Sequence, residues 1–201
     1  MCIRDSIYPY SLMSSVFTPL SGDRDPHSLK VTTSAQEWCG HTFVQIDLRE
    51  NAFHVAHHSY FESEADQTVR LAPVILEDEL WSKIRINPGA LPTGDARVIA
   101  GTQFQRLSRS AFAVEHASAA LATDDAVSSY TLAYEHRTLT IRFSTAFPHE
   151  IVGWEESITQ DSGDATRVLA TQAVRDTTIL LDYWTHNSLT DEVLREVLNL
   201  E

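Results

Sequence analysis

Residues 29–48 (LKVTTSAQEWCGHTFVQIDL) and 52–62 (AFHVAHHSYFE) form two runs in which apolar and polar side chains alternate. A period of two is typical of a β-strand that is buried on one face only. The tripeptide Arg49-Glu50-Asn51 separates the runs, and asparagine is common in tight hairpin turns. The two runs therefore predict a β-hairpin.

The register of this hairpin sorts its side chains onto two faces. If Glu50 and Asn51 are the two turn residues, the numbers of paired positions add up to 101. The first face is mostly apolar and should pack on the core; it carries Leu48–Phe53, Ile46–Val55, Val44–His57, Thr42–Ser59, Gly40–Phe61 and Trp38–Ser63. The second face carries Asp47–His54, Gln45–Ala56, Phe43–His58, His41–Tyr60 and Cys39–Glu62.

The second face gathers side chains that can bind metals or act as nucleophiles. Cys39, His41, His58 and Glu62 offer the thiolate, imidazole and carboxylate groups that zinc-type ions prefer. Cys39 also shares this face with His41, and a nearby imidazole favours the thiolate form of a cysteine. The simplest interpretation is a polar, solvated outer face, which antiparallel sheets normally have. The spacing matches no known zinc module, and the sequence leaves all three interpretations open.

Strand patterns dominate the rest of the chain, with two helical segments. Residues 76–86 (LEDELWSKIRI) change to a helical period, with acidic residues 77–79 in the first turn and basic residues in the last. A second helix is expected after Ser188, which suits the N-cap position. Strands are expected at residues 7–20 (an edge strand containing two prolines), 97–107, 111–121, 130–134, 138–144, 151–159 and 166–184.

These elements predict a mainly β protein. We expect an antiparallel curved sheet or an incomplete barrel, with a short mid-chain helix and a C-terminal helix. Residues 1–6 (MCIRDS) resemble an artefact of sequence assembly. Residues 7–201 are expected to form a single β-rich domain.

The charge of the chain limits its partners. Acidic residues outnumber basic ones by 28 to 15, and the formal net charge is −13. Because such a chain brings carboxylates near phosphates, we expect no nucleic acid partner and no electrostatic docking on anionic lipid. The sequence contains no run of about 18 apolar residues, so no transmembrane segment is predicted in it.

Five blocks of the sequence together resemble a known family. They are YPYSLMSSVFTPL (8–20), LKVTTSAQEWCGHTF (29–43), HSYFESEADQ (58–67), LEDELWSKIRINPGALPTG (76–94) and YWTHNSLTDEVLREVL (183–198). They resemble an uncharacterised family of bacterial cell-envelope proteins, often predicted lipoproteins, over nearly all of the chain after residue 6. The resemblance implies a periplasm-facing location and no chemistry. It also implies that the domain formed by residues 7–201 lacks upstream strands. Some members are labelled septum formation inhibitor, but the Ser-Pro-Arg-Arg signature of those nucleotide pyrophosphatases does not occur here.

Two functions from different classes follow from these observations. The first is a non-enzymatic cell-envelope protein, without a cofactor, that binds an apolar small molecule or an envelope protein. The resemblance favours it, as does the absence of the GxGxxG, Walker-type, GxSxG and HExxH motifs. The alternative is a metal- or cysteine-dependent enzyme, with zinc as the candidate metal. It predicts that Cys39, His41, His58 and Glu62 converge on one point.

Overall fold

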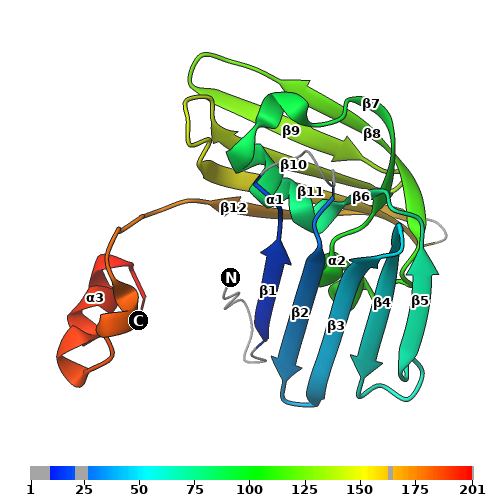
Figure 1. The fold of residues 1–201 in the computed structure, drawn as a ribbon, viewed down its shortest axis with the longest axis horizontal. Helices are drawn as coiled ribbons and strands as arrows, with labels where there is room; N and C mark the ends of the chain where they lie inside the picture. Colours follow the sequence, from blue (N-terminus) through cyan, green and yellow to red (C-terminus); the bar gives the residue numbers. More distant parts are fainter. Residues whose placement is uncertain (1–9, 21–26, 163–164, 201) are drawn as a thin grey trace.

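Twelve strands form two sheets in the computed structural model, which describes residues 10–20, 27–162 and 165–200 (Figure 1). The strands of the second sheet run across those of the first at a steep angle, and the two sheets curve into a half-barrel. The predicted mainly β fold with a short mid-chain helix and a C-terminal helix is confirmed. The residues proposed as an assembly artefact, 1–6, lie outside the described residues.

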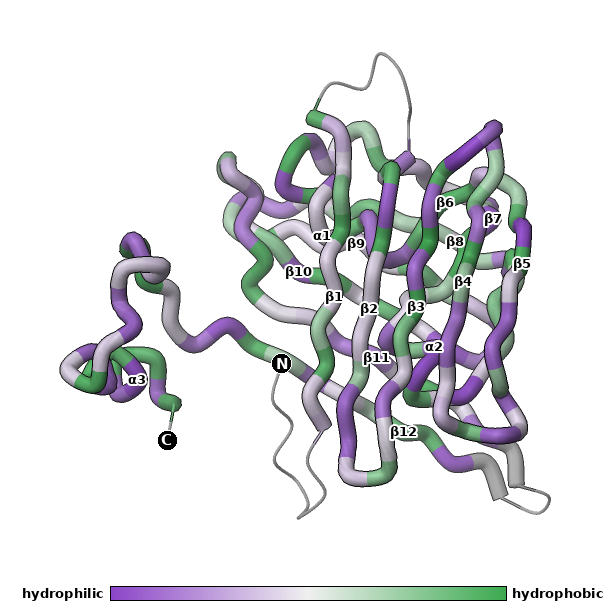
Figure 2. Tube along the Cα trace, turned by 60° about the horizontal axis from the view of Figure 1, so that its bottom comes forward, coloured by the Kyte–Doolittle hydropathy of each residue, from purple (hydrophilic) through white to green (hydrophobic). Residues whose placement is uncertain are grey.

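The first sheet, sheet A, is a five-stranded antiparallel meander in the order of the chain. Its strands are β1 (Ser11–Phe17), β2 (Lys30–Glu37), β3 (Gly40–Arg49), β4 (Ala52–Ser59) and β5 (Gln67–Leu71). The predicted edge strand is β1, although residues 7–9 of that prediction lie outside the described part of the chain. Figure 2 shows polar and apolar residues alternating along this sheet, as expected for one buried and one open face.

The register predicted for the hairpin is confirmed along the paired part of β3 and β4. Thr42 pairs with Ser59 and Leu48 with Phe53, so the paired numbers add up to 101 as expected. Glu50 and Asn51 have φ angles of 49° and 54°, the left-handed backbone of a two-residue hairpin turn. The predicted core face is largely buried, because every second residue on each strand points into the protein.

The prediction of one continuous strand through residues 29–48 is wrong at its middle. The chain turns at Trp38 and Cys39, and Glu37 pairs with Gly40 across that turn. The β3–β4 ladder ends at Thr42 and Ser59, so the expected pairs 41–60, 40–61, 39–62 and 38–63 do not form. Gly40 is required here because a Cβ atom would lie 2.4 Å from the ring of Tyr60.

The second sheet, sheet B, has seven strands in the order β12-β11-β10-β9-β8-β7-β6. They are β6 (Ile75–Leu76), β7 (Gly94–Ile99), β8 (Val114–Ala122), β9 (Val127–Ala133), β10 (Arg137–Ser144), β11 (Ile151–Ser162) and β12 (Ala165–Val174). Every pair is antiparallel except β6–β7, which is parallel. This parallel pair exists because helix α1 (Glu77–Ile86), followed by the 3-10 turn Pro88–Ala90, makes the crossover between the two strands.

The two sheets meet at α1. Leu80 and Ile84 of this helix are fully buried against the apolar face of sheet B. Leu76 and Ile99, from β6 and β7, instead pack with the buried residues of sheet A. The strands at the start of sheet B thus supply apolar side chains to the core of sheet A, which joins the sheets.

Two of the strand predictions need correction. Residues 97–107 are not one strand: β7 ends at Ile99, and a short helix, α2 (Thr102–Ser108), follows Gly101. Residues 166–184 are not strand throughout, because β12 ends at Val174 and a 3-10 turn spans Tyr183–Thr185. The predicted strand was too long because several residues after Val174 are apolar, and apolar residues also occur outside buried strands.

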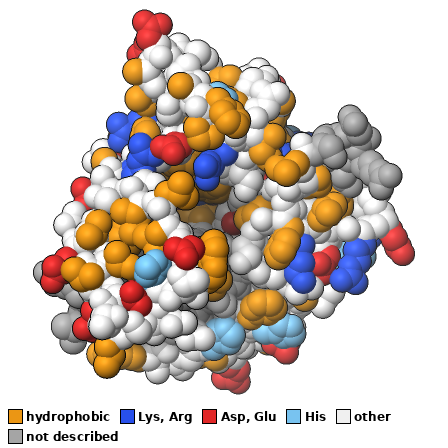
Figure 3. Space-filling model, turned by 60° about the vertical axis from the view of Figure 1, so that its left-hand side comes forward, with side chains coloured by type: hydrophobic (Ala, Val, Ile, Leu, Met, Phe, Trp, Pro, Cys, Tyr) orange, Lys and Arg blue, Asp and Glu red, His pale blue; other side chains and the backbone are white. Residues whose placement is uncertain are grey.

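The C-terminal segment projects from the sheets. A 3-10 turn (Leu189–Glu192), capped by Ser188, precedes α3 (Val193–Val197), so the predicted terminal helix is present but shorter than its apolar stripe. Leu180, Trp184 and Leu189 are exposed on this segment. Figure 3 brings this side forward and shows hydrophobic groups separated by charged ones. Within the described residues, we find no helix with the length and apolar character needed to cross a membrane.

Candidate functional site

The four residues of the predicted metal or cysteine site do not gather at one point. Cys39 is exposed in the β2–β3 turn, and His41 is exposed at the start of β3. Exposed His58 pairs instead with Asp66, at 3.2 Å, and Glu62 is exposed in the loop after β4. No three His, Cys, Asp or Glu side chains of the described chain are grouped so that they could hold a metal ion. The zinc hypothesis stays a prediction, and its four candidate ligands do not meet at one point.

The first turn of α1 holds three consecutive buried carboxylates, Glu77, Asp78 and Glu79. We had expected this acidic turn from the helix dipole, which favours negative charge at a helix N-terminus. The structure shows a further role, because each carboxylate binds a different part of the fold. We refer to these three residues as the carboxylate clamp.

Glu77 connects α1 to sheet B. Its two oxygens accept hydrogen bonds from the guanidinium of Arg137 at 2.7 Å each, and Tyr134 donates to it at 2.6 Å. Burial, followed by the charge of Glu77, raises the pKa of Tyr134 above its ordinary value. A Cβ at position 101 would lie 2.6 Å from the Glu77 carboxylate, so a larger residue there would require this carboxylate to shift within its hydrogen bonds to Arg137 and Tyr134.

Glu79 connects α1 to the start of sheet A. Its carboxylate accepts hydrogen bonds from the backbone N–H of Ser28 at 2.6 Å and from Lys83 at 2.8 Å, and His27 lies 3.3 Å away. Burial opposes ionisation of this group. The pKa of Glu79 is nevertheless lowered, because the bonds from His27, Lys83 and Ser28 outweigh that burial.

Asp78 connects α1 to α2. The backbone N–H and the hydroxyl of Thr102 donate to its carboxylate at 2.9 and 2.8 Å. Because that hydroxyl proton is used, Thr102 must accept from Thr33 (2.6 Å), and Thr33 in turn from Ser14 (2.6 Å). A directed hydrogen-bond chain thus runs from β1 through β2 and α2 to α1. Burial raises the pKa of Asp78 to about 6, although the bonds from Thr102 lower it.

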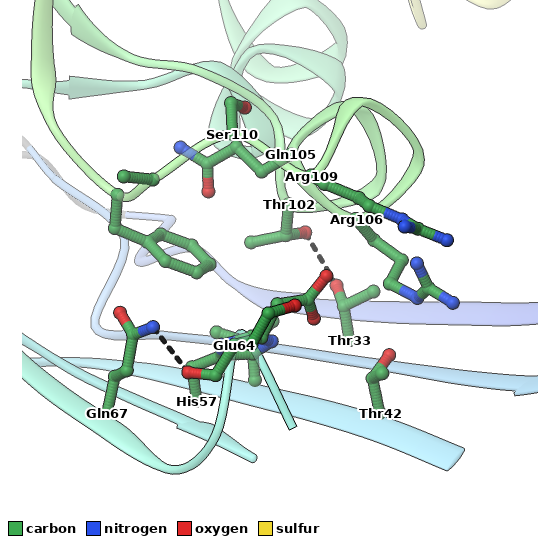
Figure 4. Close-up of a pocket in the computed structure, with 14 residues that line it drawn as sticks. Thr33, Thr42, His57, Glu64, Gln67, Thr102, Gln105, Arg106, Arg109 and Ser110 are labelled. Atoms are coloured by element: carbon green, nitrogen blue, oxygen red, sulfur yellow. Dashed lines mark hydrogen bonds between the residues drawn. The ribbon is translucent and has the colours of Figure 1, made fainter. Parts of the chain in front are cut away.

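A cavity of about 170 Å³ lies beside this hydrogen-bond chain, between the buried face of sheet A and α2 (Figure 4). We call it the α2 cavity. Sheet A supplies Thr33, Thr42, Val44, His57 and Gln67; α2 and the residues after it supply Thr102, Gln105, Arg106, Arg109, Ser110, Ala111 and Phe112; the β4–β5 loop supplies Ser63 and Glu64. The lining is polar around the threonines and the glutamine, and apolar at Val44, Ala111 and Phe112.

Gln105 is the unusual member of this lining. Its side chain is only 2% exposed, yet neither its amide nitrogen nor its amide oxygen has a hydrogen-bond partner. The Nε atom of the adjacent Arg106 is also buried without a partner. A buried polar atom left without a partner costs about 1–3 kcal/mol, so folded proteins rarely tolerate several together. Three such atoms, from two adjacent residues of the lining, are an unusual concentration of unpaired polar groups.

Of the two arginines that line the α2 cavity, one is paired with a carboxylate of the described chain and the other is not. Arg106 is bound to Glu37, to which Tyr60 also donates. Arg109 stacks on the ring of Phe61 at 4.3 Å, and no acidic residue of the described chain pairs with it. Arg109 also has a φ of 55° at the C-cap of α2, a backbone region that normally favours glycine or asparagine.

Two further titratable groups line the cavity. Burial lowers the pKa of His57, so its imidazole is neutral at pH 7. Glu64 accepts a hydrogen bond of 2.6 Å from Ser59. In the part of the chain that the structure describes, no hydrogen bond joins His57 to a hydroxyl or thiol.

Comparison with known proteins adds no family to this geometry. No protein-family model, curated protein or solved structure matches the chain. The resemblance to bacterial cell-envelope proteins, and the envelope location and partners that it implies, therefore stay predictions.

Our sequence analysis did not identify the α2 cavity, although a signal for it exists. Thr102, Gln105, Arg106 and Arg109 are spaced i, i+3, i+4 and i+7, the pattern of one helical face. A helical period is normally recognised from apolar residues, whereas this face is polar. Gly101 before it and the polar residues within it would have predicted a helix with a buried polar side.

Proposed function

We propose that this protein is a non-enzymatic binding protein that holds a small polar molecule in the α2 cavity. The observation that carries the proposal is the buried amide of Gln105, whose donor and acceptor both lack a partner at the wall of the cavity. Binding sites are concave and carry a few polar groups that orient the ligand. An unpaired buried amide at the wall of such a cavity fits that description.

The size of the α2 cavity limits the ligand. Its volume of about 170 Å³ would hold on the order of five or six water molecules. A lipid chain or a folded peptide does not fit in this space, whereas a metabolite of a few non-hydrogen atoms does. The polar side chains of Thr33, Thr42, Thr102 and Gln105 favour a polar ligand over the apolar ligand that the sequence led us to expect.

Hydrogen bonds behind the α2 cavity hold one of its walls in place, which favours binding there. Thr102 lines the cavity and is fixed by Asp78, so one wall is held by the carboxylate clamp. Side chains that are held before a ligand arrives lose little conformational freedom when it binds. The metal- or cysteine-dependent alternative lacks comparable support, because its four residues lie apart.

A fragment screen by nuclear magnetic resonance tests the proposal. Small polar compounds would be added to the ¹⁵N-labelled chain while the side-chain NH₂ signals of Gln105 and the backbone signals of Thr102 and Phe112 are followed. We expect a subset of compounds to shift these signals and leave those of β10 and β11 unchanged. Gln105→Met should abolish these shifts. Gln103→Met is the matched control, since Gln103 lies on the same helix but bonds Ser14 at 3.2 Å.

Two results would count against the proposal. In the first, no compound of the set shifts the signals around the cavity, which would mean that water alone occupies it. In the second, the same compounds cause the same shifts in Gln105→Met, which would place their binding elsewhere.

A further inference from the structure

The α2 cavity presents two different chemistries, which together describe its ligand; this inference rests on the proposed binding function. Gln105 offers one donor and one acceptor side by side on its amide. Arg109 offers a guanidinium without an acidic partner among the described residues. In Figure 4 the amide of Gln105 and the guanidinium groups of Arg106 and Arg109 point to opposite sides, with Thr102 between them. A ligand that satisfies both ends must carry two groups.

The amide of Gln105 selects the first group. A carboxylate can only accept hydrogen bonds and an ammonium group can only donate them, so each would leave one amide atom of Gln105 unpaired. A primary amide of the ligand presents an acceptor next to a donor on one edge and can pair with both atoms at once. Because both atoms of Gln105 are buried, leaving either one unpaired is costly.

The charge around the rim selects the second group. Arg106 is already paired with Glu37, and Glu64 is already bonded to Ser59, which leaves Arg109 as the unpaired charge. Arginine binds carboxylates through two parallel hydrogen bonds. Arg109 is exposed, and Arg85 and Arg97 likewise have no acidic partner among the described residues, but of these three only Arg109 lines the cavity.

The backbone at Arg109 supports this assignment independently. Its φ of 55° places an arginine where glycine would be free of strain. Strained residues persist where the surrounding structure holds them, and they are common at ligand-binding positions. From this position Arg109 lines the cavity.

We infer that the α2 cavity binds a small carboxylate that also carries a primary amide, with the amide against Gln105 and the carboxylate against Arg109. Monoamides of short dicarboxylic acids, such as succinamate, belong to this class. N-acylated amino acids do not, because a trans secondary amide points its N–H and C=O in opposite directions. The ligand fills the space between the two ends and replaces the water that a free cavity of this polarity holds.

Three probes separate the two groups at pH 7. Succinamate carries the primary amide and the carboxylate, its methyl ester carries only the amide, and butanoate carries only the carboxylate. We would titrate each into the ¹⁵N-labelled chain and follow the NH₂ signals of Gln105 and the backbone signals of Thr102 and Phe112. Succinamate should bind at least about tenfold more tightly than either other probe, since each of them lacks one of the two contacts.

Variants assign each contact to its residue. Gln105→Met, followed through the backbone signals of Thr102 and Phe112, should weaken succinamate at least about tenfold and leave butanoate unchanged. Arg109→Gln should remove the preference for succinamate over its ester. Arg97→Gln is the matched control, because Arg97 is exposed on β7 and does not line the cavity. Arg109→Gly should do the same as Arg109→Gln without lowering the melting temperature, because glycine relieves the positive φ.

The outcomes distinguish this inference from the function on which it rests. If the three probes bind equally, or if butanoate binds most tightly, the ligand class is wrong and the binding function stands. The same holds if all three fail while other fragments shift the Gln105 signals. If no probe and no fragment shifts those signals, the inference and the proposed function both fall.

Discussion

The carboxylate clamp and the α2 cavity are both polar regions inside an apolar fold, and they differ in their hydrogen bonds. Glu77, Asp78 and Glu79 are buried, and each accepts bonds from a different element. Gln105 is buried to a similar degree, but its amide has no partner in the chain. The comparison teaches that the pairing of a buried polar group, rather than its burial, separates a structural role from a binding role.

The two regions are joined through Thr102. Its hydroxyl donates to Asp78 on one side, and its side chain lines the cavity on the other. The position of one cavity wall therefore depends on the clamp. Substitutions in the clamp, and of Thr102 which it holds, should change stability strongly, whereas substitution of Gln105 in the cavity wall should change binding and leave stability almost unaffected. The following four predictions test that contrast in order of expected size.

Arg137→Ala should have the largest effect. It leaves Glu77 buried without its cation, and breaking a buried ion pair in this way costs about 3–5 kcal/mol. Arg175→Ala is the control, because Arg175 forms a pair of 2.6 Å with Glu150 on the surface, where such pairs contribute at most about 1 kcal/mol. Urea unfolding of both variants measures the difference. Equal losses would mean that the clamp is no more important than a surface pair.

Asp78→Asn should change how stability depends on pH. Burial raises the pKa of Asp78 from 3.8 to about 6, so the folded state holds this proton more tightly than the unfolded state. The resulting stabilisation is complete below pH 3.8 and is lost as the pH rises through 6. Relative to Asp78→Asn, the wild-type free energy of unfolding should therefore fall by up to about 3 kcal/mol between pH 4 and pH 7. Parallel pH profiles of the two proteins would contradict a raised pKa at Asp78.

Thr102→Val should cost about 2 kcal/mol. The variant keeps the shape of the side chain but removes the hydroxyl that joins Asp78 to Thr33. It should also raise the pKa of Asp78 further, because a hydrogen bond that lowers this pKa is lost. Thr131→Val provides the comparison, since Thr131 only shares a bond of 3.1 Å with Thr140 on a partly open face. A loss no greater than that of Thr131→Val would separate Thr102 from the clamp.

Gln105→Met should have the smallest effect on the ligand-free protein. Because the amide has no partner to lose, removing it should leave stability unchanged or increase it by up to about 1 kcal/mol. Gln103→Met is again the control in urea unfolding. If Gln105→Met destabilises the protein by more than about 1 kcal/mol, the amide is a structural group like those of the clamp, and the comparison drawn above fails.

The hairpin of β3 and β4 shows how much of the strand pairing can be predicted from local sequence. The alternation of residues 29–62 and the turn at Glu50 and Asn51 predicted the register of β3 and β4 correctly. They could do so because a two-residue turn fixes which residues pair, and a period of two fixes which face each side chain occupies. The same logic failed at Trp38 and Cys39, where a second turn interrupts a run that still alternates.

The acidic residues 77–79 illustrate what local sequence leaves open. Their place at the start of α1 was predictable from the helical period and the helix dipole. Their burial was not, because their partners Arg137, Thr102 and Ser28 lie between 24 and 60 residues away along the chain. Short-range patterns carry no information on such contacts.

The amino-acid sequence alone was enough to predict the β-rich character, the hairpin register and the helix at residues 76–86, because all three depend on interactions between near neighbours. The packing of sheet A against α2 was needed to create the cavity and to isolate the amide of Gln105. That outcome depends on which distant surfaces come together and on which polar groups find no partner there. Both the contacting surfaces and the unpaired polar groups are determined only when the whole chain has folded.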